Sequence, residues 1–122
     1  MIQSTELKAQ QEVIKALIPR AEIKHKSIGL ENGSLPDSQI FASSSHSAAH
    51  IHTRCRLNNS SSGVQAWCSL KEDMNEYIGA HVPKGAVFTK VVTQGRGDTA
   101  QYVKKYRMTY SLDGQTWFDV ET

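Results

Sequence analysis

The sequence lacks the features that mark several large classes of protein. Its 122 residues include two cysteines, no stretch of Lys and Arg, and a formal net charge of only +2. Two cysteines allow at most one disulfide, and a charge of +2 gives no reason to expect a nucleic-acid partner. No apolar run approaches the length that spans a membrane, and no apolar segment typical of a signal peptide follows the N-terminus. We therefore expect either a piece of a longer protein or export by another route.

Signatures of catalysis are also missing. The chain contains no Gly-rich phosphate loop, no nucleophile elbow and no HExxH helix, so we predict that it is not an enzyme. The length suits one domain with a modest core, and the ordinary content of apolar residues predicts a folded, globular chain.

The most informative stretch runs from Val87 to Val120. It predicts three β-strands: an apolar run over residues 88–92, an alternating segment that ends at Tyr110, and a return strand from Trp117. A period of two places Tyr106, Met108 and Tyr110 on one face of a sheet. Asp113-Gly114 allows the positive φ of a tight hairpin between the last two strands.

Upstream, the pattern predicts one helix and one further strand. Residues Ser4–Ile18 have a capping residue and an apolar face, and Pro19 ends the pattern. We assign residues 1–26 to this helix and a linker, and the helix could either dock on the domain or mediate oligomerisation. The predicted strand is Ser38–Ala42.

Many ordered blocks of this sequence resemble the discoidin domain, also called the coagulation factor V/VIII C-type domain. The blocks are Gly29-Leu30-Glu31-Asn32-Gly33, Pro36-Asp37-Ser38-Gln39-Ile40, Ala42-Ser43-Ser44-Ser45, Arg56-Leu57-Asn58, Ala66-Trp67-Cys68, Asp73, Tyr77-Ile78, Thr93-Gln94-Gly95-Arg96, Asp98, Gln101-Tyr102-Val103, Tyr106, Tyr110-Ser111-Leu112-Asp113-Gly114 and Trp117. The details around Trp67 and Gly97 resemble slime-mould discoidin lectins and invertebrate adhesion proteins.

The resemblance implies an all-β fold, an antiparallel β-sandwich of jelly-roll type preceded by the short N-terminal helix. It also implies strands at Arg54–Leu57 and Glu76–Ala80. Residues 27–122 would form this domain, incomplete at its C-terminus, because such domains run to roughly 150 residues. Without the closing strands, we expect Trp67 and the apolar face of the last strands to be only partly shielded. The chain alone would then be marginally stable, aggregate, or form a homo-oligomer.

The resemblance also implies the function, an extracellular adhesion module that binds a cell-surface glycan or glycoprotein through loops at one end of the sandwich. The candidate ligand residues are Ser45, His46, Ser47, Arg96, Gly97 and Asp98. The loop around His46 lacks the large apolar residues of membrane-binding members, so membrane binding should be weak or absent. Alternatives are an anionic phospholipid-binding domain, a structural or oligomerising fragment, and a carbohydrate-binding accessory of an enzyme.

Arg96-Gly97-Asp98 is an RGD tripeptide, and an integrin partner could recognise its charges. Otherwise Gly97 would supply a positive φ and Asp98 would bond its own backbone. No cofactor is required, although Ca²⁺ could bind. His46, His50 and His52 precede Cys55, but their spacing matches no usual zinc pattern, and we predict no metal site.

Two kinds of covalent modification remain open. Cys55 and Cys68 could form a disulfide in an oxidising compartment, or Cys68 could be a free buried thiol. The Asn-X-Ser sequons at Asn32, Asn58 and Asn59 permit N-glycosylation in a secreted protein.

Overall fold

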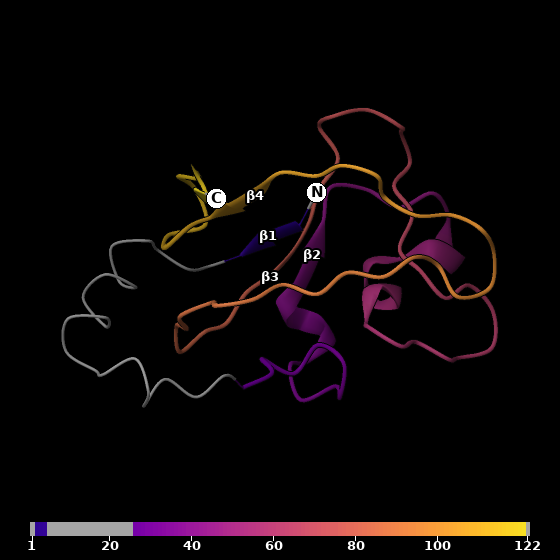
Figure 1. Cartoon of the computed structure of the whole chain (residues 1–122), viewed down its shortest axis with the longest axis horizontal. Coiled ribbons are helices and arrows are strands. Elements are labelled where there is room, and N and C mark those ends of the chain that lie inside the picture. The colour runs from indigo at the N-terminus through magenta and orange to yellow at the C-terminus, as the bar shows by residue number, and fades with distance from the viewer. Residues whose placement is uncertain (1, 5–25, 122) are drawn as a thin grey trace.

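The computed structural model describes residues 2–4 and 26–121, and its centre is a single five-stranded sheet (Figure 1). The strands are β1 (Ile2–Ser4), β2 (Ile40–Ala42), β3 (Ile78–Ala80), β4 (Met108–Tyr110) and β5 (Phe118–Asp119). Their order across the sheet is β2-β3-β1-β4-β5. The predicted strands around Ile40, Ile78, Met108 and Phe118 are therefore present, although each is short.

The sheet is mixed: its strand pairs within the predicted domain, residues 27–122, are antiparallel as expected, and the unpredicted strand β1 adds parallel pairs. β2 pairs with β3, and β4 with β5, in antiparallel fashion, whereas β1 lies parallel to both β3 and β4. β1 takes this position by pairing with strands that are far from it in the sequence, and a local sequence pattern does not reveal such pairing. The described residues form one sheet and no closed sandwich. Ser4 ends β1, and the rest of the helix predicted over Ser4–Ile18 lies outside the described residues.

Two other predicted strands are absent from the described chain. Residues 88–92 form no strand, because a strand exists only where its backbone pairs with a neighbour and no described strand pairs there. Arg54–Leu57 was also predicted as a strand, but the 3-10 helix η4 covers His52–Cys55. Two more 3-10 helices are η2 (Asp37–Gln39) and η3 (Ala48–His50).

The buried apolar core described by the structure is small. It consists of Leu35, Ile40, Ile78, Ala80 and Tyr110. As expected for incompletely shielded side chains, Trp67, Met108 and Trp117 are half-buried and Tyr106 is exposed, but Tyr110 is buried. The Trp67 indole Nε1 donates to the Ser44 carbonyl oxygen at 2.8 Å, so the polar edge of this half-buried ring is satisfied.

The hairpin between β4 and β5 is built as its sequence predicts. Gly114 has φ +74°, and the Asp113 carboxylate accepts the backbone N–H groups of Gln115 and Thr116, each at 2.8 Å. These N–H groups, with Ser111, lower the pKa of Asp113 to about 2. The turn therefore stabilises the ionised form of the Asp113 carboxylate more in the folded chain than in the unfolded chain.

We expect acid to weaken the fold partly through this turn. A carboxyl group with a lowered folded pKa contributes stability above its unfolded pKa, near 3.8, and that contribution is lost as the pH falls toward about 2. Carboxyl NMR titration should place the pKa of Asp113 near 2. Urea unfolding of Asp113→Asn should depend less steeply on pH between 4 and 2 than unfolding of the wild type. Identical slopes would contradict this role.

The long loops gather at one end of the molecule, away from the hairpin (Figure 1). The segment between β2 and β3, which carries η3 and η4, lies beside the segment that precedes β4. Two hydrogen bonds join these segments, from the Asn58 N–H to the Gln94 side chain and from the Gln65 N–H to Asp98 Oδ1 at 3.2 Å. The fold therefore brings distant polar loops together, as the resemblance implies for a ligand-binding end.

Candidate functional site

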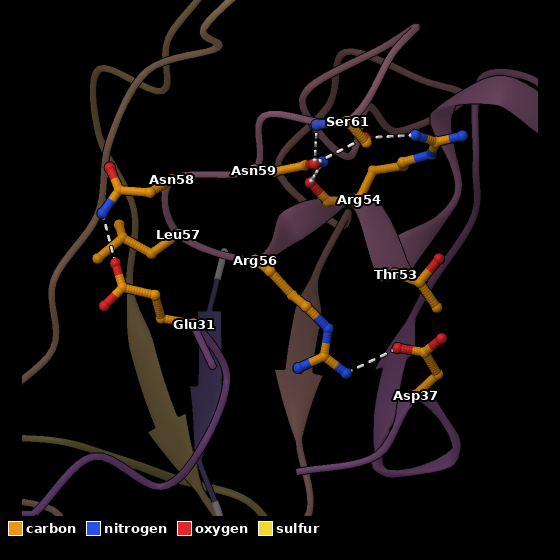
Figure 2. A pocket seen from close by; sticks show the side chains of 9 residues that line it. All are labelled: Glu31, Asp37, Thr53, Arg54, Arg56, Leu57, Asn58, Asn59 and Ser61. Atoms are coloured by element: carbon orange, nitrogen blue, oxygen red, sulfur yellow. Dashed lines mark hydrogen bonds and ion pairs between the residues drawn. The ribbon is translucent and has the colours of Figure 1, made fainter. Parts of the chain in front are cut away.

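A polar pocket of about 340 Å³ lies beside η4 at this loop end. Figure 2 shows the side chains that line it, which come from the turn before η2, from η2 itself, from η4 and from the loop after η4. They are Glu31, Asp37, Thr53, Arg54, Arg56, Leu57, Asn58, Asn59 and Ser61. Leu57 is the one apolar side chain in this lining, so the pocket mainly offers charges, amides and hydroxyls.

Arg56 forms the floor of the site and ties it to the turn before η2. Its guanidinium donates to the carbonyl oxygens of Gly29, Leu30 and Leu35 at 3.3, 2.8 and 2.8 Å. It also forms an ion pair with Asp37 at 2.7 Å (Figure 2). Only 17% of the Arg56 side chain is exposed. A planar fork with several donors suits this role, because it can satisfy carbonyls in several directions at once.

Arg54 and Asn59 shape one wall of the pocket. Arg54 Nη1 donates to Ser61 Oγ at 2.7 Å, and Asn59 Oδ1 accepts both the N–H and the hydroxyl of Ser61. Asn59 Nδ2 in turn donates to the Arg54 carbonyl oxygen at 3.2 Å. Figure 2 shows these three side chains converging. The wall is therefore preorganised by contacts within a single loop.

Asn58 forms the opposite rim. It has φ +56°, and its Nδ2 donates to the Glu31 carboxylate across the pocket (Figure 2). Its backbone N–H donates to Gln94, which precedes the Arg96-Gly97-Asp98 loop. Asn58 therefore connects the pocket to the second candidate loop.

Within that loop, Arg96 and Asp98 bind each other. Arg96 Nε and Nη2 donate to Asp98 Oδ1 and Oδ2 at 2.7 and 2.9 Å, a two-point ion pair. This pairing lowers the pKa of Asp98 well below its usual range and raises the pKa of Arg96. Gly97 is not at positive φ; a Cβ there would lie 2.4 Å from Gln65 Oε1. The prediction that Gly97 supplies positive φ was therefore wrong.

The other candidate residues are Ser45, His46 and Ser47, and a backbone hydrogen bond joins His46 to Cys68. The His46 N–H donates to the Cys68 carbonyl oxygen at 2.8 Å, and Ser47 Oγ lies 2.7 Å from His50 Nδ1. Ser47 also caps η3 by accepting the Ala49 N–H at 3.2 Å. Neither this group nor Arg96-Gly97-Asp98 lines the pocket.

Sequence reasoning therefore missed the pocket residues as ligand contacts. Arg54 and Arg56 were placed on a strand, and Asn58 and Asn59 were considered only as glycosylation sites. Two arginines beside two adjacent amides within six residues were a visible polar signal. The 3-10 helix η4, which orients them, was not predicted.

Cys55 and Cys68 are both half-buried free thiols in the structure, and a disulfide between them in an oxidising compartment stays a prediction. Burial raises the pKa of the Cys55 thiol to about 11, despite the nearby Arg56 charge. A thiol with a raised pKa is a poor nucleophile at neutral pH. Among the described residues, no group of three or more His, Cys, Asp and Glu side chains is placed to hold a metal ion.

Comparison with known proteins gives the class of protein. The F5/8 type C domain family matches residues 39–122, so the chain belongs to this family. The resemblance to discoidin domains is thereby confirmed, and members of the family are β-sandwich, non-catalytic binding modules. In the described part of the chain, no helix has the length and apolar character needed to cross a bilayer.

Particular relatives agree with this assignment. Over 88 residues the chain is 39% identical to Discoidin-1 of Dictyostelium discoideum, a match that covers 66% of this chain and 34% of that protein. It is 33% identical over 97 residues to EGF-like repeat and discoidin I-like domain-containing protein 3 of Homo sapiens (74% and 20% covered). It is 36% identical over 95 residues to bovine (Bos taurus) lactadherin (72% and 22% covered).

The chain thus spans about a third or less of the length of these relatives. No solved structure matches it significantly.

Proposed function

We propose that the chain is an extracellular, non-catalytic adhesion module that binds a cell-surface carbohydrate at its loop end. The observation that carries this proposal is the pocket beside η4, where eight of nine lining side chains are polar. Sugars present hydroxyl groups that both donate and accept, so they suit a site with acceptors and donors in fixed positions. Glu31 supplies carboxylate acceptors and Arg54 supplies donors.

The ion pair between Arg96 and Asp98 makes an integrin a less favourable partner than a sugar. To bridge an integrin, Arg96 and Asp98 would have to break their two-point ion pair and separate. A sugar can instead bond to the outside of such a pair. We therefore keep Arg96, Gly97 and Asp98, and the Ser45–His46–Ser47 group, as a second contact area for a larger glycan.

We expect Arg54→Ala to weaken glycan binding at least about tenfold, because a hydrogen bond from a charged donor contributes about 1.5–3 kcal/mol. A glycan array should first identify a sugar that the wild type binds saturably, and calorimetry should then compare variants. Arg107→Ala is the matched control, since Arg107 is exposed and forms an ion pair with Asp119 on β5. Its affinity should equal that of the wild type.

The loop residues are tested in the same assay. If Arg96→Ala/Asp98→Ala weakens binding and Arg54→Ala does not, the sugar binds at the loop rather than in the pocket. Failure of the folded wild-type chain to bind any glycan on the array would refute the proposed function.

A second candidate, binding to anionic phospholipid, has one observation in its favour. Tyr102 and Val103, next to the Arg96 loop, are 71% and 66% exposed, and Lys104 and Lys105 follow them. Exposed apolar side chains beside basic ones suit attachment to an anionic bilayer, but they also suit contact with a second copy of the chain. Sedimentation with phosphatidylserine vesicles at physiological salt, abolished by Tyr102→Ser/Val103→Ser, would favour the lipid.

A further inference from the structure

The three Asn-X-Ser sequons are not equivalent in the folded chain. They are Asn32-Gly33-Ser34, Asn58-Asn59-Ser60 and Asn59-Ser60-Ser61. We propose that Asn32 is the one of the three asparagines that accepts an N-linked glycan on the folded domain. This inference goes beyond carbohydrate recognition and does not depend on what the pocket binds.

The chemistry of N-glycosylation determines what an acceptor asparagine requires. Asn Nδ2 forms a bond to C1 of the first sugar of a lipid-linked oligosaccharyl pyrophosphate, and Nδ2 gives up one proton. The bond from C1 to the pyrophosphate oxygen breaks, and the lipid pyrophosphate leaves with the bonding electrons. The product is a bulky group on the amide nitrogen. An acceptor asparagine on a folded domain therefore needs an amide nitrogen that is uncommitted and has open space around it.

Asn32 meets both conditions. It is exposed, and its Oδ1 accepts the Ser34 N–H at 2.9 Å, which fixes the carboxamide in an Asx turn beside the hydroxyl of the sequon. Among the described residues, its Nδ2 makes no hydrogen bond. Gly33 has φ +81°, and apart from Gly33 itself and its two chain neighbours no described heavy atom lies within 4 Å of the position a Cβ would take there. The turn therefore leaves open space next to the acceptor.

Neither Asn58 nor Asn59 has an uncommitted amide nitrogen. Asn58 Nδ2 donates to the Glu31 carboxylate, so a sugar on this nitrogen would have to displace Glu31. Asn59 is half-buried, and both ends of its carboxamide are used, by the Arg54 carbonyl oxygen and by Ser61. Figure 2 shows Asn58 and Asn59 among the lining of the pocket, where a glycan would compete with these contacts.

The test gives purified, folded chain to an oligosaccharyltransferase with a lipid-linked oligosaccharide donor. Mass spectrometry should find a single added glycan, on Asn32. Two synthetic peptides, residues 28–37 and 55–64, serve as unfolded references and should both be modified. The difference between chain and peptides isolates the effect of the fold from that of the sequon itself.

Ser34→Ala should abolish modification of the folded chain, whereas Ser60→Ala, which removes the Asn58 sequon, should leave it unchanged. The proposal is overturned if the folded chain is modified at Asn58 or Asn59. It is also overturned if Asn32 stays unmodified while the 28–37 peptide reacts.

Discussion

Replacing Arg56 by methionine is expected to lower the free energy of unfolding by about 3 kcal/mol, since it removes a mostly buried guanidinium and leaves part-buried carbonyl oxygens without their donor. The guanidinium satisfies three carbonyl oxygens and the Asp37 carboxylate from one position. Methionine retains an apolar stem but cannot donate. The Leu30 and Leu35 carbonyl oxygens would lose their charged donor. This loss would fall next to the core, because the Leu35 side chain is buried.

Arg54→Met is the matched control, because it removes the same chemical group two residues away. Arg54 donates from its side chain to the exposed Ser61 hydroxyl, a contact whose loss should cost below about 1 kcal/mol. Urea unfolding, followed by tryptophan fluorescence, should place the midpoint of Arg56→Met well below that of Arg54→Met. Equal midpoints would mean that the Arg56 network does not hold the turn before η2 in place.

Local sequence patterns predicted the elements whose partners are close in the chain or whose turns are specified by residue type. The hairpin at Asp113-Gly114 is such a case, since a glycine with positive φ and an aspartate that caps two N–H groups need no distant partner. The strand implied by the resemblance over Glu76–Ala80 is present as β3, which is buried at every position of Ile78–Ala80. Consecutive residues are sufficient to specify these features.

Features that depend on distant segments were not predictable. The parallel pairing of Ile2 with both Ile78 and Met108 joins residues more than seventy positions apart, and no local pattern encodes it. The segment around Arg54 has strand-like residues, but the contacts of Arg56 with the turn before η2 accompany a 3-10 helix instead. Tertiary contacts override local preference in both places.

The candidate site shows the same division. Its location at the loop end followed from the resemblance, and the loops do converge there. The roles of individual side chains did not follow, because they depend on which polar groups bind each other. Arg96 and Asp98 are paired internally, whereas the side chains that surround open space are those near Arg54.

Gly29→Ala is expected to destabilise the chain by about 3 kcal/mol or more, because two costs combine. Gly29 has φ +99°, a conformation that costs an L-residue roughly 1–2 kcal/mol. A Cβ at this position would also lie 2.0 Å from Ser34 Oγ and 2.6 Å from the Leu35 backbone nitrogen. The serine side chain can rotate away, but the Leu35 nitrogen donates to the Gly29 carbonyl oxygen at 3.0 Å and closes the turn.

Gly33→Ala separates the two costs, because Gly33 lies in the same turn at φ +81° with open space around its Cβ position. Gly33→Ala should lower the free energy of unfolding only by the conformational cost, about 1 kcal/mol. The Gly29 carbonyl also accepts from Arg56, so Gly29→Ala and Arg56→Met disturb one network. Their combined loss in urea unfolding should therefore be smaller than the sum of the single losses. Equal losses for the two glycine variants would show that the turn adapts to a Cβ at Gly29. Additive losses for Gly29→Ala and Arg56→Met would show that the contacts of Arg56 are independent of Gly29.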